Sequence, residues 1–332
     1  MSDHPPSTMN ALFLTSSDKA SHNNRPYKLL AGPVPVPNAP QNHLLIRVKA
    51  AAVDARDVAI CRAWRSLPTR PAQTSPPPPP VPGCALSGVV VTAPPHHPFQ
   101  PGQHVAALTR FGGAFAPYAT VHADECWLTR LPFADAAVTA GAASVAFQAV
   151  RVAALKGNDT VAIAGTLTAA GALIARTCRL VYGVNVIAGV HGPHQQAVAQ
   201  SYANCVVDRS RNKVTAQLGH AVVDVAFDVE GRLEQLCKLV KKGGTVVRVI
   251  AATETIKQSQ AQRVRAICSA RRVNLIRVEG RLDARAVQST KNLLQTLQIC
   301  APSGPAFGIK QWGPALTAAE QGVDVGAVVL LH

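Results

Sequence analysis

Acidic residues, aromatic residues and paired cysteines are scarce in this sequence. Its 332 residues include 18 Asp and Glu against 33 Lys and Arg. Charged residues make up 15% of the chain, well below the usual ~25%, so the net charge of +15 reflects missing acids rather than dense lysine. A hydrophobic fraction of 48% excludes a disordered or fibrous chain. At roughly 150 residues per domain, the length predicts two domains.

The shortage of aromatic residues bears on the basic excess. Aromatics form 5% of the chain, and the most basic stretch, 263–285, lacks the aromatic interleaving of a base-stacking platform. No zinc-finger or RNA-recognition signature accompanies it, so we do not expect a nucleic-acid partner. We expect its arginines on the surface, where an acidic partner could dock. They are Arg263, Arg265, Arg271, Arg272, Arg277, Arg281 and Arg285.

The eight cysteines stand singly, without a CxxC pair, which argues against a zinc-ribbon site. The first residues lack a basic segment followed by a long apolar run, so we expect no secretory signal and a reduced, cytoplasmic protein. The best apolar run, Val161 to Ala175, is shorter than the ~20 residues of a membrane span. We therefore expect no membrane segment.

The first part of the chain is predicted to be β-rich. Short alternating segments are separated by glycine and proline turns, which is typical of a small barrel-like domain. Thr74–Pro82 is proline-rich, and we expect it to be an exposed loop. The predicted strands are Leu44–Ala52, Gly88–Thr92, Val105–Leu108 and Ala116–Val121.

The pattern changes near Leu131, after which strands and helices alternate. This alternation predicts an α/β class with a doubly wound parallel sheet. The predicted strands are Thr160–Ala164, Val184–Ala188, Cys205–Val207, Val222–Phe227, Thr245–Ile250 and Asn274–Val278. The predicted helices are Ala134–Leu155, Ala169–Leu180, Gln195–Ser201, Arg232–Val240 and Ala284–Ile299.

We expect three segments along the chain. Residues 9–131 form the β-rich domain, 132–282 the doubly wound domain, and 283–332 a return segment that completes the first domain with a last strand at Ala327–Leu331. The active site is expected between the domains, outside the carboxyl ends of the parallel strands.

A candidate phosphate-binding turn runs from Val161 to Gly171, from a predicted strand into a predicted helix. A dinucleotide pyrophosphate needs backbone N–H groups at a helix N-terminus and no bulky side chain in the way. Gly165 can make the tight turn, and Gly171 can let the helix approach the sheet. The central position of the usual glycine trio is Thr168, so an ordinary strand-to-helix turn stays open as an alternative.

The segment after the next strand is where an adenosine ribose would lie. NAD preference usually needs a carboxylate there, and the segment from Gly189 to His194 contains none. His191, His194 and, after the third strand, Arg209 could instead face a 2′-phosphate. NADPH is therefore the expected cofactor, and the alternative is that these are exposed loop residues.

Ordered motifs along nearly the whole chain resemble the medium-chain dehydrogenase/reductase superfamily. The resemblance implies a GroES-like catalytic domain and a Rossmann domain. The matching motifs are LLIRVKAAAVDARD (Leu44–Asp57), PGCALSGVVV (Pro82–Val91), FQPGQHVAAL (Phe99–Leu108), GGAFAPYATV (Gly112–Val121), LPFADAAV (Leu131–Val138), VDVAFDVEG (Val223–Gly231), KKGGTVVRV (Lys241–Val249) and GAVVLL (Gly326–Leu331).

Within the superfamily, the chain is most similar to the fungal trans-acting polyketide enoyl reductases. In that branch the nucleotide turn reads small residue–Ala–Thr–Gly, which Thr168-Ala169-Ala170-Gly171 resembles, and Pro193-His194 matches its next turn. The resemblance therefore implies that Thr168 and Ala169 take part in cofactor binding.

The departures from the family concern the reacting groups. Zinc-dependent members carry Cys and His-Glu at the positions of Asp54, Cys84 and Ala85, so no zinc is expected. The Lys and Thr of the enoyl reductases correspond to Ala59 and Val145, the latter beside Ser144. Arg62 stands where other enoyl reductases have a catalytic Tyr.

The candidate catalytic residues are Asp54, Arg56, Arg62 and Ser144, with either arginine able to stabilise an enolate oxygen. The leading hypothesis is NADPH-dependent reduction of an activated C=C bond in polyketide or other secondary metabolism. The first alternative keeps the scaffold for a non-redox cyclisation or isomerisation, which orientation alone can accelerate. A non-catalytic or nucleic-acid-binding relative is the lesser alternative.

The expected partners follow from the same resemblance. They are a small-molecule or carrier-bound acyl substrate and a polyketide synthase. Arginines flank the last predicted strand of the doubly wound domain, where relatives that dimerise pair across the two-fold. Because like charges would meet there, a monomer is favoured over a dimer.

Overall fold

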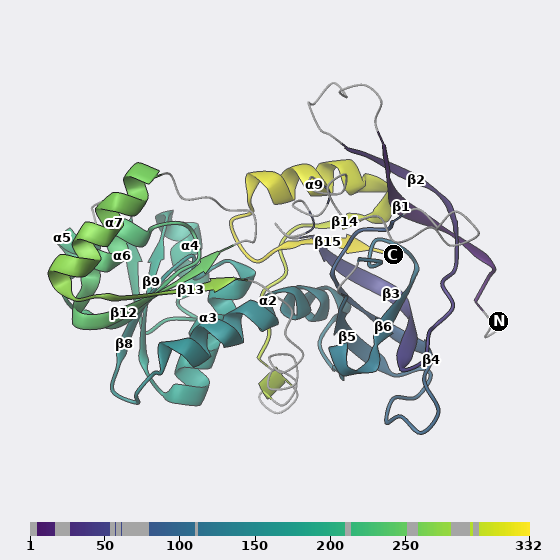
Figure 1. The fold of residues 1–332 in the computed structure, drawn as a ribbon, viewed down its shortest axis with the longest axis horizontal. Helices are drawn as coiled ribbons and strands as arrows, with labels where there is room; N and C mark the ends of the chain where they lie inside the picture. Colours follow the sequence, from purple (N-terminus) through teal and green to yellow (C-terminus); the bar gives the residue numbers. More distant parts are fainter. Residues whose placement is uncertain are drawn as a thin grey trace. The chain divides into compact units, whose positions relative to one another are not determined.

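The computed structural model describes residues 5–16, 27–53, 57, 61, 80–109, 112–209, 214–250, 258–279, 293–294 and 299–332. The chain forms two compact units (Figure 1). The first comprises Met1–Gly141, Ser303–Val323 and Ala327–His332, and the second comprises Ala142–Pro302 and Asp324–Gly326. The C-terminal part of the chain thus returns to the first unit, apart from three residues that belong to the second.

The first unit is built on a seven-stranded sheet in the order β14-β15-β3-β4-β5-β7, with β6 paired to β3. The neighbouring strands are antiparallel except β14 and β15. The strands are β3 (His43–Val53), β4 (Ala85–Thr92), β5 (His104–Leu108), β6 (Tyr118–His122), β7 (Cys126–Leu128), β14 (Ala306–Gly308) and β15 (Val328–Leu331). The 3-10 turns η2 (Ala123–Glu125) and η3 (Ile309–Gln311) and the helix α9 (Trp312–Gln321) complete it.

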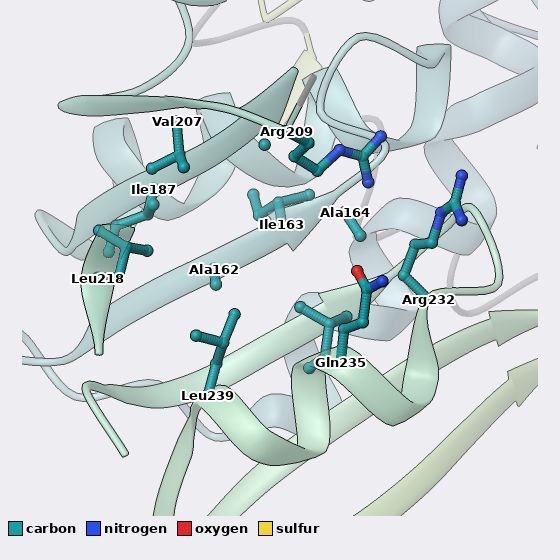
Figure 2. A pocket seen from close by; sticks show the side chains of 12 residues that line it. Ala162, Ile163, Ala164, Ile187, Val207, Arg209, Leu218, Arg232, Gln235 and Leu239 are labelled. Carbon is teal, nitrogen blue, oxygen red and sulfur yellow. The ribbon is translucent and has the colours of Figure 1, made fainter. Parts of the chain in front are cut away.

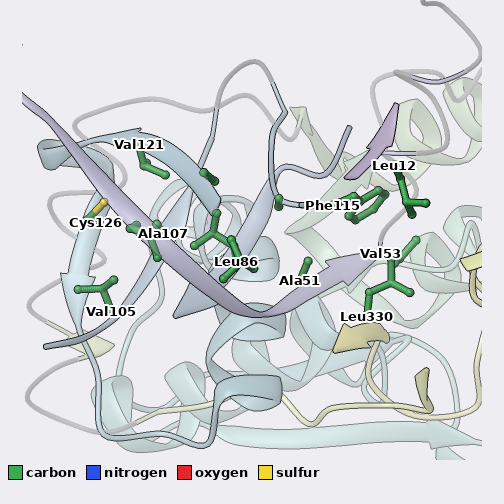
Figure 3. Close-up of a cluster of buried hydrophobic side chains, with 14 of the residues drawn as sticks. Leu12, Ala51, Val53, Leu86, Val105, Ala107, Phe115, Val121, Cys126 and Leu330 are labelled. Atoms are coloured by element: carbon green, nitrogen blue, oxygen red, sulfur yellow. The ribbon is translucent and has the colours of Figure 1, made fainter. Parts of the chain in front are cut away.

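Every second residue of these strands faces one core, as period-two alternation requires. Figure 3 shows this core, where Val53 of β3, Leu86 of β4 and Leu330 of β15 lie together with Phe115. Leu12 joins it from a separate hairpin of β1 (Thr8–Ser16) and β2 (Tyr27–Pro35). The four strands predicted for this part are confirmed, whereas the hairpin, β7 and β14 were not predicted.

The second unit has a six-stranded, fully parallel sheet in the order β10-β9-β8-β11-β12-β13. The order reverses between β8 and β11, which is the topological switch point of a doubly wound fold. Its strands are β8 (Thr160–Ala164), β9 (Asn185–Val190), β10 (Cys205–Asp208), β11 (Val223–Asp228), β12 (Val240–Ile250) and β13 (Asn274–Glu279). Its helices are α3 (Ala169–Tyr182), α4 (Gly192–Ala199), α5 (Val214–Leu218), α6 (Leu233–Leu239) and α7 (Gln258–Arg271). The six strands and the α/β class agree with the sequence prediction.

The helix α2 (Phe133–Ala153) is the one helix of the described residues that is long and apolar enough to cross a membrane. In its most apolar window, 78% of the residues are buried inside the structure, as expected for a core helix.

Several element boundaries differ from the prediction. Helix α4 begins at Gly192, before the predicted Gln195, because Pro193 is favourable in the first turn of a helix. Strand β12 begins at Val240 rather than Thr245. Helices α5 and α7 were missed, because the apolar residues of α7 do not recur with a helical period. Most of the helix predicted at Ala284–Ile299 lies outside the described residues, and within the described part residues 293–294 are helical.

Candidate functional site

The turn between β8 and α3 is closed by one threonine. Thr168 is the N-cap of α3, and its Oγ1 accepts a hydrogen bond from the backbone N of Gly171 at 3.1 Å. The same hydroxyl donates to the carbonyl oxygen of Gly165 at 2.8 Å. Thr168 thereby satisfies one of the N–H groups that a helix N-terminus leaves without an intrahelical partner. The helix starts at Ala169, which is buried.

Both glycines of this turn are required by geometry. Gly165 has φ +87°, a left-handed conformation that glycine adopts without strain. A Cβ on Gly171 would lie 1.9 Å from the carbonyl oxygen of Gly165, so the first turn of α3 can pack this closely only because Gly171 has no side chain. The backbone amides of the turn are therefore not covered by a side chain from either position.

A short segment from the C-terminal part of the chain fixes the same turn. The backbone N of Gly326 donates to the carbonyl oxygen of Leu167 at 2.7 Å, and Thr168 forms a β-bridge with Gly326. The turn is thus held from two sides, by its own cap and by residues 324–326 of the second unit.

The predicted ribose-side histidines lie at the end of β9. His191 and His194 are both exposed at the start of α4. A carboxylate does reach the end of β9, although it does not come from the segment between Gly189 and His194. Asp208 at the end of β10 accepts a hydrogen bond from the backbone N of Gly192 at 3.3 Å.

Arg209 follows β10 and crosses the carboxyl ends of the neighbouring strands. Its Cδ lies 3.0 Å from the place a Cβ on Gly189 would occupy, so glycine in β9 makes room for the side chain. One guanidinium nitrogen lies 2.8 Å from the Glu230 carboxylate. The Arg209 side chain is 9% exposed, and its Nε is buried without a hydrogen-bond partner.

A cavity of about 30 Å³ adjoins Arg209 (Figure 2). It lies against residues of β8, β9 and β10, and Arg232 and Gln235 reach it from the start of α6. In Figure 2, the guanidinium groups of Arg209 and Arg232 lie at the same end of the cavity. The apolar wall consists of Ala162, Ile163, Ala164, Ile187, Val207, Leu218, Leu236 and Leu239.

A buried ion pair supports the start of α6. Asp228 ends β11 and Arg248 lies opposite it in β12, with 3.5 Å between the guanidinium and the carboxylate and side-chain exposures of 0% and 3%. The other carboxylate oxygen of Asp228 accepts a hydrogen bond from the backbone N of Arg232 at 2.6 Å. Asp228 therefore fixes the place from which Arg232 reaches the cavity.

Arg232, Glu230, Asp228 and Arg248 were not predicted as site residues from the sequence. The signal for Asp228 and Glu230 was two acids at the end of a buried apolar strand, in the block Val223–Gly231, which was used only for the family resemblance. Acids at the carboxyl end of a parallel strand lie where ligands bind in such sheets, and this rule would have found Asp228 and Glu230.

Of the four predicted catalytic residues, Ser144 is the one that lies in the described part of the structure. Asp54, Arg56 and Arg62 lie outside the described residues. Ser144 is 1% exposed within α2, so it is enclosed by protein. Among the described residues, no three His, Cys, Asp or Glu side chains form a group that could hold a metal ion.

Comparison with known proteins agrees with the fold described above. Residues 40–132 match the family model of the alcohol dehydrogenase GroES-like domain. No curated protein matches the sequence significantly.

Among solved structures, a cobalt- and zinc-bound alcohol dehydrogenase from Pyrobaculum aerophilum has a TM-score of 0.75 at 21% identity, covering 98% of this chain and 100% of that one. The quinone oxidoreductase from Thermus thermophilus, solved also with NADPH, has a TM-score of 0.73 at 19% identity, covering 98% and 100%. A variant of the crotonyl-CoA carboxylase/reductase AntE in complex with NADP has a TM-score of 0.76 at 17% identity, covering 99% and 96%.

The matched GroES-like domain, the reversal of strand order between β8 and β11 and the full-length structural likeness lead to one conclusion. The chain has the fold of the medium-chain dehydrogenase/reductase superfamily.

Proposed function

We propose that this protein is an NADPH-dependent oxidoreductase that reduces an activated C=C bond, in the manner of an enoyl reductase. The observation that carries the proposal is the turn from Gly165 to Gly171, where two glycines place the N-terminus of α3 at the switch point of a parallel sheet. Two of the similar structures are complexes with NADPH or NADP, which supports the choice of cofactor.

The residues present fit such a dinucleotide. The pyrophosphate would lie against the backbone amides at the start of α3, where the helix dipole favours negative charge. Arg209, His191 and His194 would surround the adenosine ribose and its 2′-phosphate. The bound nicotinamide would supply a hydride, and the task of the chain is to orient cofactor and acceptor and to exclude water.

The proposed acceptor is an α,β-unsaturated acyl chain, free or held by a carrier protein, as in polyketide biosynthesis. Reduction of such a group places charge on the carbonyl oxygen, and a fixed guanidinium can stabilise it. We assign this role to Arg56 or Arg62, whose positions in the sequence match the catalytic segment of the enoyl reductases. No zinc is required for this step.

The proposal is tested by nucleotide binding and isotope transfer. Titration calorimetry should show binding of NADPH in the micromolar range (about −8 kcal/mol). NADPH deuterated at one face of the nicotinamide C4 should pass its label to the β-carbon of a crotonyl thioester. Absence of binding by either NADPH or NADH would overturn the proposal. Conversion of an unsaturated acyl substrate with no nucleotide added would support cyclisation or isomerisation on the same scaffold instead.

A further inference from the structure

The side chain of Glu230 packs against the turn between β8 and α3. It follows β11 by two residues, and its Cγ lies 2.8 Å from the place a Cβ on Gly165 would occupy. The side chain therefore covers the bare face of the glycine whose lack of a side chain opens the turn to a nucleotide.

The carboxylate of Glu230 holds Arg209 through one nitrogen only. Its oxygen is 2.8 Å from Nη2 of Arg209, whereas Nε of the same guanidinium is buried without a hydrogen-bond partner. A guanidinium presents its donors in a planar fork that a phosphate can fill with two parallel hydrogen bonds. Arg209 thus has a buried donor that Glu230 leaves unsatisfied, which is an unfavourable arrangement.

The excess of positive charge around the cavity also favours binding of a second anion. Arg209 and Arg232 lie at the same end of the cavity (Figure 2), while Glu230 supplies a single negative charge there. No ion pair joins Arg232 to an acid among the residues that the structure describes. A phosphate monoester, which carries up to two negative charges near neutral pH, would compensate both guanidinium groups better than the carboxylate does.

We propose that Glu230 is a specificity-determining residue. Its carboxylate pairs with Arg209 and competes with the 2′-phosphate of NADPH for the guanidinium group. NADPH must displace the Glu230 carboxylate from Arg209, whereas NADH, without a 2′-phosphate, leaves the pair intact. Glu230 therefore weakens NADPH binding relative to NADH binding. The inference rests on the proposed nucleotide-binding function and adds to it a residue that sets the choice between the two cofactors.

The test compares dissociation constants of NADPH and NADH, and of 2′,5′-ADP and 5′-AMP, for the full chain and its variants. Glu230→Gln keeps the shape of the side chain and removes its charge. We expect it to tighten NADPH and 2′,5′-ADP about five- to tenfold and to change NADH and 5′-AMP less than about twofold. In an Arg209→Gln background the same substitution should have no effect on NADPH, because the group for which Glu230 competes is gone.

Glu234→Gln is the matched control. Glu234 is exposed to a similar extent, 35% against 32% for Glu230, but it pairs with Lys238 on the surface of α6. It removes the same charge without touching Arg209, so NADPH and NADH affinities should shift together and only slightly. Thermal unfolding of each variant checks that the fold is kept.

The outcomes separate this inference from the proposed function. If the parent protein binds both nucleotides and Glu230→Gln changes them equally, or Glu234→Gln reproduces its effect, Glu230 does not set specificity and the proposed function stands. Weaker NADPH binding in Glu230→Gln overturns the inference in the same way. If the parent binds none of the four ligands, the proposed function fails, and the inference fails with it.

Discussion

A Cβ on Gly171 would lie 1.9 Å from the carbonyl oxygen of Gly165. The contact is with backbone rather than with a flexible side chain, so relief requires the first turn of α3 to move away from β8. The residues on which the proposed pyrophosphate site depends are therefore also the residues that join the helix to the sheet.

The first prediction concerns Gly171→Ala. The added methyl group should destabilise the protein by about 1–3 kcal/mol, the usual cost of overpacking, and should abolish NADPH binding because the amides of the turn are displaced. Urea unfolding and calorimetry measure the two effects. Gly313→Ala is the control, because no atom lies within 4 Å of its added Cβ. This helical substitution should be neutral or stabilising, and a comparable loss in both variants would contradict the steric explanation.

The fold was predictable because short stretches of sequence indicate most of its strands, turns and helices. The strand Thr160–Ala164, the turn at Gly165 and the helix after Thr168 follow one another within a few residues, so alternation and turn residues were sufficient to place them. The same holds for the five other parallel strands. By contrast, the hairpin of β1 and β2 was not predicted, and α7 has no apolar period.

The site was less predictable because its polar contacts depend on strand order. Arg209 and Glu230 are 21 residues apart and meet only because β10, β9, β8 and β11 lie side by side in one sheet. Likewise, Asp208 at the end of β10 accepts a hydrogen bond from Gly192, which follows the neighbouring strand β9. No local pattern indicates which strand lies next to which, so Arg209 was predicted from the sequence and the acid that pairs with it was not.

The second prediction concerns the buried pair of Asp228 and Arg248. Asp228→Asn removes a charge that faces Arg248 and leaves the arginine buried with less compensation, which typically costs about 3–5 kcal/mol. NADPH affinity should fall less than stability does, because the amide oxygen of Asn can still accept the hydrogen bond from the backbone N of Arg232. Denaturant unfolding should show the loss.

The control for this pair is Lys238→Gln. It breaks the Glu234–Lys238 pair, whose lysine is 44% exposed, and should change the free energy of unfolding by about 0.5 kcal/mol or less. A loss in Asp228→Asn no larger than that of the control would show that the buried pair does not stabilise the sheet.

The third prediction concerns thiol reactivity. Cys205 is exposed, whereas Cys178 and Cys237 are buried. Burial raises the pKa of Cys178 to about 12, and burial together with the neighbouring thiol of Cys268 raises the pKa of Cys237. Because the thiolate is the reactive form, iodoacetamide at pH 8 should label Cys205 in the native protein and should label Cys178 and Cys237 only after unfolding. Peptide mass spectrometry reads out each site, and Cys205→Ser should remove the native label at that position.

The last prediction concerns pH and His332. The ring is largely enclosed, and the backbone N of His332 donates to the carbonyl oxygen of Lys49. Desolvation by burial lowers the pKa of His332 from 6.5 to about 4. Between these values the unfolded chain binds a proton that the folded chain does not, so the histidine destabilises the fold as pH falls from 6.5 towards 4.

Replacing His332 isolates this contribution from that of the carboxylates. At 1.36 kcal/mol per pKa unit, the histidine accounts for about 3 kcal/mol of lost stability by pH 4. In urea unfolding at pH 7, 5.5 and 4.5, His332→Gln should therefore lose less stability than the parent as pH decreases. His220→Gln, which changes an exposed histidine, should follow the parent. If His332→Gln and the parent lost stability in parallel, protonation of the buried ring would not be the cause, and its two nitrogens would have to be accessible to water in the folded state.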